Sequence, residues 1–195
     1  MIVPSSVSTG PDVLSALRLA TAERHAILDG GLAIAAPDAS LHDYRAHLAM
    51  LHAWLGPAEC WLAGFDDGPQ APAAPAVLLR TPLLDADLAH PAMPPGPAAR
   101  APESDWPIGA SQAYRWGVCY VIEGSQLGGS VLYRRLAEQL APHPLAFLRG
   151  SIEGPGPRWR EFMEALKAAV QSPDAVAEAC TGACDAFDRI LALRP

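Results

Sequence analysis

The chain has 195 residues, half of them apolar and 18% charged, and its formal net charge is −7. This size and composition are typical of one globular domain with a sizeable core, and they exclude a disordered chain. The negative charge argues against binding to nucleic acid or to an anionic membrane, because both require a basic surface. No apolar run approaches the roughly 18 residues of a membrane span, and the N-terminus lacks the features of a secretory signal. We therefore expect a cytoplasmic protein.

Helical periodicity dominates the first third of the chain. A helix is expected from Pro11, a residue that suits a first turn, to a stop near Gly30, with apolar residues at spacings of three and four. Ser40 and Asp43 form a capping box, which predicts the start of a second helix. Its apolar stripe continues to about Gly64.

The rest of the chain predicts further helices separated by turn-rich segments. Strand-like alternation is limited to the short stretch CYVIEG, which is embedded in a helical pattern, and no internal repeat is evident. We expect an all-α fold, a single compact domain over residues 1–195 with about six to eight helices and a flexible N-terminus at 1–10. The expected segments are a short helix at 77–88, a proline-dense loop at 90–107, a long helix at 108–140 that glycines interrupt, and two last helices at 158–170 and 174–193, the second capped by Ser172.

The cysteines do not form a recognisable metal or disulfide pattern. Cys60, Cys119, Cys180 and Cys184 include no C-x-x-C pair, and no histidine spacing completes a zinc site. We expect free thiols, buried or partly buried, in a reducing compartment.

The segment EGSQLGGS places three glycines, Gly124, Gly128 and Gly129, inside an otherwise helical pattern. Each glycine costs a helix about 1 kcal/mol relative to alanine, so the three need a reason. One interpretation is a close crossing with another helix. The other is a flat ligand that lies against bare backbone, with a kink that exposes backbone groups to it.

His25 lies on the apolar stripe of the first helix. A histidine in this position is commonly a core residue with a satisfied ring. The alternative is a metal ligand, since neutral imidazole is a good donor to iron. Combined with the glycines, His25 suggests a heme held between two helices, one offering the axial nitrogen and the other a bare, kinked surface.

These segments resemble the heme oxygenase family. The resemblance lies in ALRLATAERHAILD around His25 and in YVIEGSQLGGSVLYRRL around the glycines, and it is closest to the bacterial branch that is often paired with phytochromes. Between and after them, LRTPLLDADLAHP is similar to the family's middle helix and PRWREFMEAL to its late Trp-Phe helix. The resemblance covers nearly the whole chain and implies a multi-helix fold with heme between a proximal helix and a kinked distal helix.

The resemblance implies roles for particular residues. His25 becomes the proximal iron ligand, and Arg18 matches a basic position that meets a heme propionate. Gly124, Gly128 and Gly129 become the glycines over the distal heme face, where side chains would crowd bound oxygen. Ser125 stands where the animal-type pattern often has an aspartate that orders water; its hydroxyl can bind water but carries no charge.

Two residues near the glycine face are further candidates for anchoring heme, namely Tyr120 and Arg135. Each is equally explained as an ordinary boundary residue. The pair Arg134 and Arg135 could instead meet an acidic electron donor at the surface.

The implied reaction is the oxidative opening of heme to biliverdin, carbon monoxide and ferrous iron. Heme is then both substrate and prosthetic group, oxygen is the oxidant, and a reductase or ferredoxin supplies electrons. A bacteriophytochrome that receives the biliverdin is a further expectation of this resemblance.

Three other classes compete with this interpretation. A non-catalytic heme carrier or sensor would share His25 and the glycines. A helical di-iron protein needs Glu-x-x-His pairs, and no glutamate here has a histidine three residues later. A plain interaction bundle would use the glycines for helix packing alone.

Overall fold

The computed structural model describes residues 12–76, 78–96, 105–151 and 154–194, and over these residues the fold is all-α, as predicted. The predicted flexible N-terminus lies outside the described residues. The helices are α1 (Val13–Asp29), α2 (Leu41–Leu62), α3 (Thr81–Leu88), α4 (Gln112–Leu136), α5 (Ala146–Arg149), α6 (Gly156–Ala169) and α7 (Pro173–Ala192), with the 3₁₀ turns η1 (Ala33–Ala35) and η2 (Gly68–Gln70).

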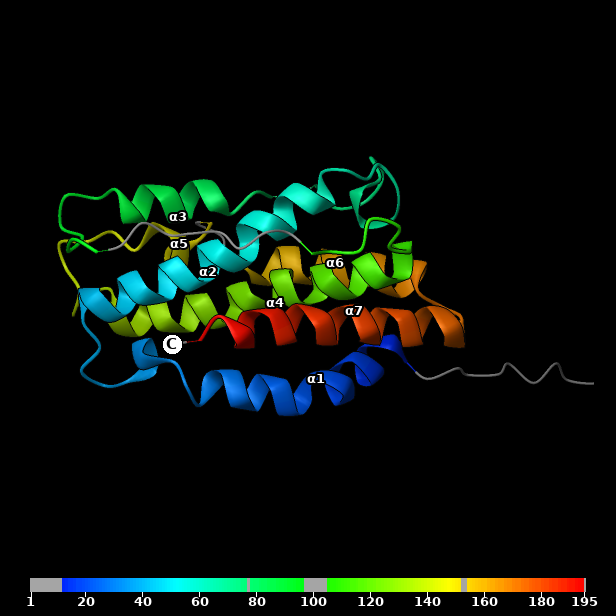
Figure 1. Ribbon diagram of the computed structural model, residues 1–195, viewed down its shortest axis with the longest axis horizontal. Helices are drawn as coiled ribbons and strands as arrows, with labels where there is room; N and C mark the ends of the chain where they lie inside the picture. The colour runs from blue at the N-terminus through cyan, green and yellow to red at the C-terminus, as the bar shows by residue number, and fades with distance from the viewer. Residues whose placement is uncertain (1–11, 77, 97–104, 152–153, 195) are drawn as a thin grey trace, which may run out of the picture.

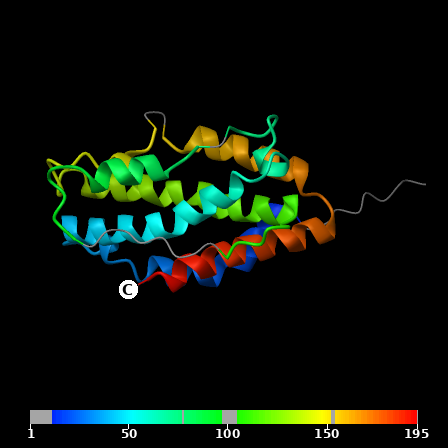
Figure 2. The ribbon, with the colours of Figure 1, turned by 45° about the horizontal axis from the view of Figure 1, so that its top comes forward.

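Helices α4 and α7 run side by side through the middle of the molecule (Figures 1 and 2). Helix α1 packs along α7 on one side, whereas α2 and α3 lie on the other. Helices α5 and α6 both pack on α4. Helix α7 therefore supports both α1 and α4, the two helices that carry the predicted site.

The crossing of α4 and α7 depends on a reciprocal pair of glycines. A Cβ atom at Gly117 would lie 1.8 Å from the carbonyl oxygen of Ala179, and one at Gly182 would lie 2.1 Å from that of Tyr114. Both distances are far below van der Waals contact, so only glycine allows the two backbones to come this close. The predicted close helix crossing thus exists, but Gly117 and Gly182 make it.

Local capping signals explain where the helices begin. The capping box of Ser40 and Asp43 and the cap at Ser172 are confirmed. The predicted start of the first helix at Pro11 is wrong: α1 begins at Val13, because the side chain of Asp12 accepts the N–H of Ser15.

The predicted long helix needs two corrections. It begins at Gln112 behind its cap Ser111, not at Ile108, whose side chain is 93% exposed outside the helix. It also ends at Leu136 and runs through the glycines as one helix, so the predicted interruption is wrong. Packing against α5, α6 and α7 compensates for the low helix propensity of glycine. The kink that the sequence suggests stays a prediction.

Prolines shift two other boundaries. Helix α3 begins at Thr81, whereas residues 78–80 are not helical, and residue 77 lies outside the described residues. Pro82 lies in its first turn, where the missing N–H costs nothing. Helix α6 begins at Gly156 with Pro157 in the same role, slightly before the predicted start.

Asp87 connects three helices through a buried carboxylate that is 1% exposed. It accepts the Tyr44 hydroxyl at 2.6 Å and the backbone N–H groups of Ala146 and Phe147 at 3.0 and 2.8 Å. The sequence does not predict helix α5. This helix has no capping side chain of its own, and the Asp87 carboxylate of α3 accepts its first backbone N–H groups instead.

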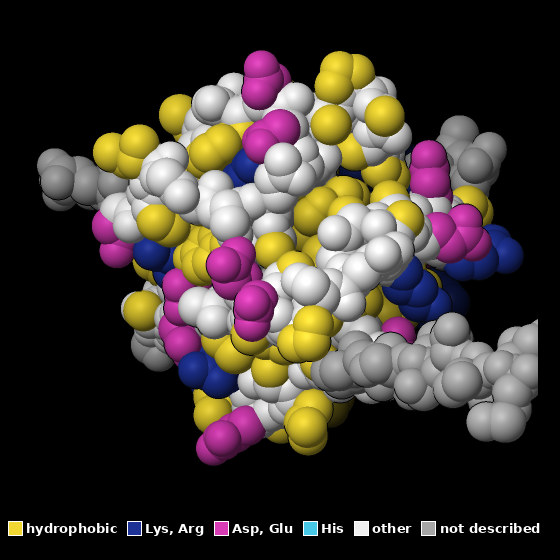
Figure 3. Space-filling view, turned by 90° about the vertical axis from the view of Figure 1, so that its right-hand side faces the viewer, with side chains coloured by type: hydrophobic (Ala, Val, Ile, Leu, Met, Phe, Trp, Pro, Cys, Tyr) yellow, Lys and Arg dark blue, Asp and Glu magenta, His cyan; other side chains and the backbone are white. Residues whose placement is uncertain are grey.

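The surface at the end where α4 and α7 begin is shown in Figure 3. Apolar side chains form small groups between acidic ones, and Lys and Arg side chains lie mainly at the margins of this view. Across the described residues, no helix has the length and apolar character that crossing a bilayer demands.

All four cysteines are free thiols, as predicted. Cys60 is exposed, which corrects the expectation that every thiol is at least partly buried. Burial raises the pKa of Cys119 to about 12, so this thiol stays protonated and unreactive near neutral pH.

Candidate functional site

His25 lies in the last third of α1 with its side chain 62% exposed, so the interpretation as a core histidine is wrong. Its Nδ1 atom lies 3.0 Å from Oδ2 of Asp29, one helical turn later. This contact leaves Nε2 as the ring nitrogen that faces away from the carboxylate. A metal-binding histidine is commonly held in this way by a carboxylate.

Asp29 is a site residue that the sequence reasoning missed. A carboxylate four residues after a candidate histidine ligand was the available signal, because i and i+4 side chains meet on one helix face.

Helix α7 fixes the position of this part of α1. The Phe187 ring lies 5.9 Å from the His25 ring between centroids. Next to it, Asp188 accepts two hydrogen bonds from the Arg24 guanidinium, at 2.7 and 2.9 Å. Contacts on neighbouring α7 residues thus hold the turn of α1 that carries the imidazole.

Gly124 and Gly128 leave part of α4 without side chains. A Cβ atom at Gly128 would meet nothing within 4 Å, and one at Gly124 would meet only the Trp159 indole, at 3.6 Å. Neither glycine is therefore required for packing against another helix, in contrast to Gly117. Nearby, Val131 is 56% exposed.

Unlike these two glycines, Gly129 is buried against another helix, and Ser125 carries a hydroxyl that bonds within α4. Gly129 is buried, with Leu148 of α5 at 3.8 Å from its Cβ position. The Ser125 hydroxyl donates to the carbonyl oxygen of Ile122 in its own helix, at 2.7 Å. The structure thus brings only part of the predicted glycine group to the open face of α4.

Arg18 and Tyr120 connect α1 to α4. Partial burial raises the pKa of Tyr120, whereas the charge of Arg18 and a hydrogen bond from it act in the opposite direction. The Tyr120 ring also packs on Trp159 of α6, with 5.4 Å between ring centroids. Arg18 and Tyr120, which the sequence indicates as separate candidates, therefore lie close together.

This pair indicates which parts of the two helices lie near each other. Arg18 and His25 are seven residues apart and share a face of α1, and Tyr120 shares a face of α4 with Gly124 and Val131. Arg18 lies close enough to Tyr120 for its charge to counteract the rise that burial causes in the tyrosine pKa. We call residues 25–32 of α1 and its following turn, and residues 124–131 of α4, the two walls.

Arg135 provides a second link at the other end of the walls. Its two terminal nitrogens donate to the carbonyl oxygens of Ala35 and Ile34 in η1, at 2.8 and 2.5 Å. Both donors are thus directed at the backbone, and this arginine connects the end of α4 to the segment that follows α1. Arg134, beside it, is exposed.

Comparisons with known proteins point to one family. The heme oxygenase family model matches residues 12–193. A heme oxygenase of Xanthomonas campestris pv. campestris strain 8004 is 40% identical over 106 residues, which are 53% of this chain and 60% of that protein. The matched part thus spans less than two thirds of this relative.

The fold is also found in a solved structure, the NO- and CO-bound heme oxygenase from Neisseria meningitidis. The TM-score is 0.72 at 22% sequence identity, and the match covers 94% of this chain and 90% of that chain. With the family model matched over almost the whole length, the chain belongs to the heme oxygenase family.

Proposed function

We propose that the protein is a heme oxygenase, which opens heme to biliverdin, carbon monoxide and ferrous iron with oxygen and external electrons. The observation that supports this most strongly is the stretch of α4 that has no side chains at Gly124 and Gly128. Arg18, on the same helix as the exposed His25, lies close to Tyr120, one turn before Gly124.

The residues present fit a heme on both faces. On the proximal side, Nε2 of His25 is the donor to iron, and Asp29 holds the ring through Nδ1. When bound, heme supplies the iron centre that activates oxygen and the ring that is oxidised. On the distal side, the absence of side chains at Gly124 and Gly128 lets a flat ring approach the backbone closely.

Polar groups at the distal wall have limited freedom. The Ser125 hydroxyl is directed at Ile122 in its own helix, so it must rotate before it can order water for proton delivery. Gly129 faces Leu148 of α5, where a Cβ atom would make ordinary van der Waals contact at 3.8 Å. We assign the distal contact itself to Gly124 and Gly128.

Arg18 is the principal candidate for a heme propionate, with Tyr120 as its partner. Arg18 is exposed, carries a full charge and already lies between the two helices. Arg135 is a weaker candidate, because both of its terminal nitrogens are directed at η1 carbonyl groups. Arginine suits this role because its planar donors match a carboxylate.

The external partners follow from this reaction. The proposed electron donor is a reductase or a ferredoxin, and the exposed Arg134 could contribute to its docking. A bacteriophytochrome is the proposed receiver of biliverdin, and the cytoplasm is the proposed location.

Titration with hemin followed by reduction tests the proposal. The wild type should develop the sharp Soret band of histidine-ligated heme, and His25→Ala should lose it. With a reductase and ferredoxin under air, the band should decay while biliverdin, identified by chromatography, appears in matching amount.

Two outcomes would count against the proposal. Histidine-ligated heme that survives turnover conditions would indicate a carrier or a sensor. A flat hemin titration would instead indicate a bundle that binds no heme.

A further inference from the structure

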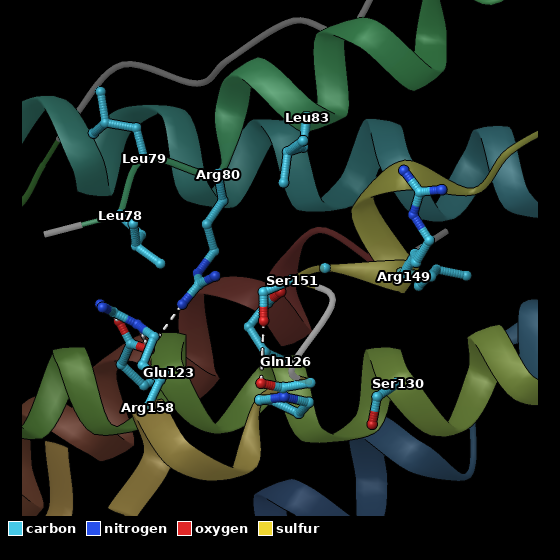
Figure 4. Close-up of a pocket in the computed structure, with 14 residues that line it drawn as sticks. Leu78, Leu79, Arg80, Leu83, Glu123, Gln126, Ser130, Arg149, Ser151 and Arg158 are labelled. Carbon is cyan, nitrogen blue, oxygen red and sulfur yellow. Dashed lines mark hydrogen bonds and ion pairs between the residues drawn. The ribbon is translucent and has the colours of Figure 1, made fainter. Parts of the chain in front are cut away.

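A cavity of about 270 Å³ lies beside α4 on a different face from the two walls. From α4 it is lined by Glu123, Gln126 and Ser130. Its other described lining residues include Leu78, Arg80, Leu83, Leu148, Arg149 and Arg158. Figure 4 shows Arg80, Glu123 and Arg158 grouped at one side of this cavity and Arg149 at the other.

Positive charge exceeds negative charge in the lining. Arg80 and Arg158 share one carboxylate: Oε2 of Glu123 accepts from both at 2.8 Å, and Oε1 accepts from Arg158 at 2.6 Å. Arg149 adds a third guanidinium and has no hydrogen-bond or ion-pair partner among the described residues. The described lining residues therefore carry three cations against one anion.

Arg80 is the most constrained of these cations. Its side chain is 7% exposed, and its Nε atom is buried with no hydrogen-bond partner among the described residues. Glu123 compensates its charge, whereas no described residue uses the Nε donor.

Glu59 is close to Arg80 but does not line this cavity. Its oxygens accept the backbone N–H of Arg80 and the hydroxyl of Thr81, both at 2.6 Å. It lines a neighbouring cavity of about 360 Å³ instead.

Between the charged sides, the lining is partly apolar and also includes the polar Gln126 and Ser151. Leu83 points into the space in Figure 4, and Leu78 and Leu148 also line it. A ligand that fits this arrangement has a charged end and a small apolar body. The volume is near the lower limit for ligand pockets, which restricts the body to a small molecule.

We propose that this cavity binds a small organic carboxylate. The carboxylate is held by Arg149, and the apolar body packs on Leu83 and Leu148. This site is separate from the two walls, and its existence does not depend on heme cleavage.

Calorimetric titration with benzoate tests the site in both heme-free and hemin-loaded protein. The wild type should bind benzoate equally in both states, and the neutral analogue benzamide should bind at least about tenfold more weakly. Arg149→Gln should weaken benzoate binding by about tenfold or more. Arg160→Gln removes an exposed arginine from α6 that does not line the cavity, and it should leave the affinity unchanged.

A second variant keeps the test independent of Arg149. Leu83→Glu places a carboxylate in the cavity at a position that is 37% exposed, so the fold should tolerate it, and benzoate binding should be lost. The proposal is overturned if the wild type does not bind millimolar benzoate, if benzamide binds as tightly, or if Arg149→Gln and Leu83→Glu bind like the wild type. Competition between hemin and benzoate would place the anion at the walls and would also overturn it.

Discussion

The ion-pair contact between His25 and Asp29 links two side chains that are both mostly exposed, so its contribution to folding is small. Its importance is for the ligand. A carboxylate on Nδ1 makes the opposite nitrogen a stronger donor and fixes the rotation of the ring. The pair is therefore better tested by heme binding than by stability.

Asp29→Asn should weaken hemin binding by about tenfold and shift the Soret band, while the protein remains folded. Spectroscopic titration with hemin measures both changes. Glu23→Gln, which removes an exposed carboxylate from the same helix, is the matched control and should bind like the wild type. Equal affinity in Asp29→Asn would show that the carboxylate does not act through the imidazole.

His47 on α2 should give the protein a pH-dependent stability. Burial lowers its pKa from 6.5 to about 4, and its Nδ1 is buried without a hydrogen-bond partner among the described residues. The unfolded chain therefore takes up a proton at higher pH than the folded protein does. The stabilisation is complete above pH 6.5 and is lost as the pH falls toward 4.

The loss in unfolding free energy should be on the order of 3 kcal/mol at most. Urea denaturation between these pH values measures it. In His47→Leu this part of the pH dependence should be missing, whereas His42→Gln, at an exposed position on the same helix, should keep it. Identical pH profiles for His47→Leu and the wild type would contradict the assignment.

At the scale of the element, α4 uses its glycines for different purposes along its length. Gly117 allows contact with the α7 backbone, while Gly128 has open space where a side chain would begin. The same substitution at the two positions should therefore have opposite effects on stability.

Gly117→Ala should destabilise the fold by about 2–3 kcal/mol, because the new methyl group forces the two backbones apart. Gly128→Ala should stabilise it by about 0.5–1 kcal/mol through helix propensity, yet weaken hemin binding. Thermal unfolding and hemin titration of both variants measure this contrast. Loss of stability in Gly128→Ala would mean that a part of the protein already packs against that wall.

Features that depend on residues close together in the sequence were predictable from the sequence. The caps at Ser40 and Ser172 act over three residues, so the local pattern contains all the information. The role of Gly117 was not predictable, because its partner Gly182 is remote in the chain and a single glycine gives no periodic signal.

The whole molecule depends on long-range polar contacts that no local pattern indicates. Asp87→Ala should cost about 3–5 kcal/mol, since it leaves the Tyr44 hydroxyl and two backbone N–H groups of α5 buried without an acceptor. Asp85→Ala, on the same helix, removes an exposed carboxylate that pairs with His52, and it should cost less than about 1 kcal/mol. Urea denaturation measures the difference, and equal losses would refute this assignment.

Part of the candidate site was predictable because its residues lie in characteristic local segments. His25, Arg18, Tyr120 and the glycines stand in recognisable segments, and the structure brings Arg18 and Tyr120 together. The sequence could not show that Arg135 is directed at η1 or that Gly129 faces α5, because both depend on how remote segments pack. Asp87 was missed entirely, since its partners come from distant parts of the chain.

The contacts of Phe187 and Asp188 with α1 have a consequence for the C-terminal part of the chain. Phe187 lies beside the imidazole and Asp188 holds the neighbouring Arg24, so a shift of that helix changes the tilt of the ring before it disturbs the core. Damage at the C-terminus should first appear as an altered colour of the heme complex, with helix content still intact. The absorption spectrum of the bound heme would then report a displacement of the last helix.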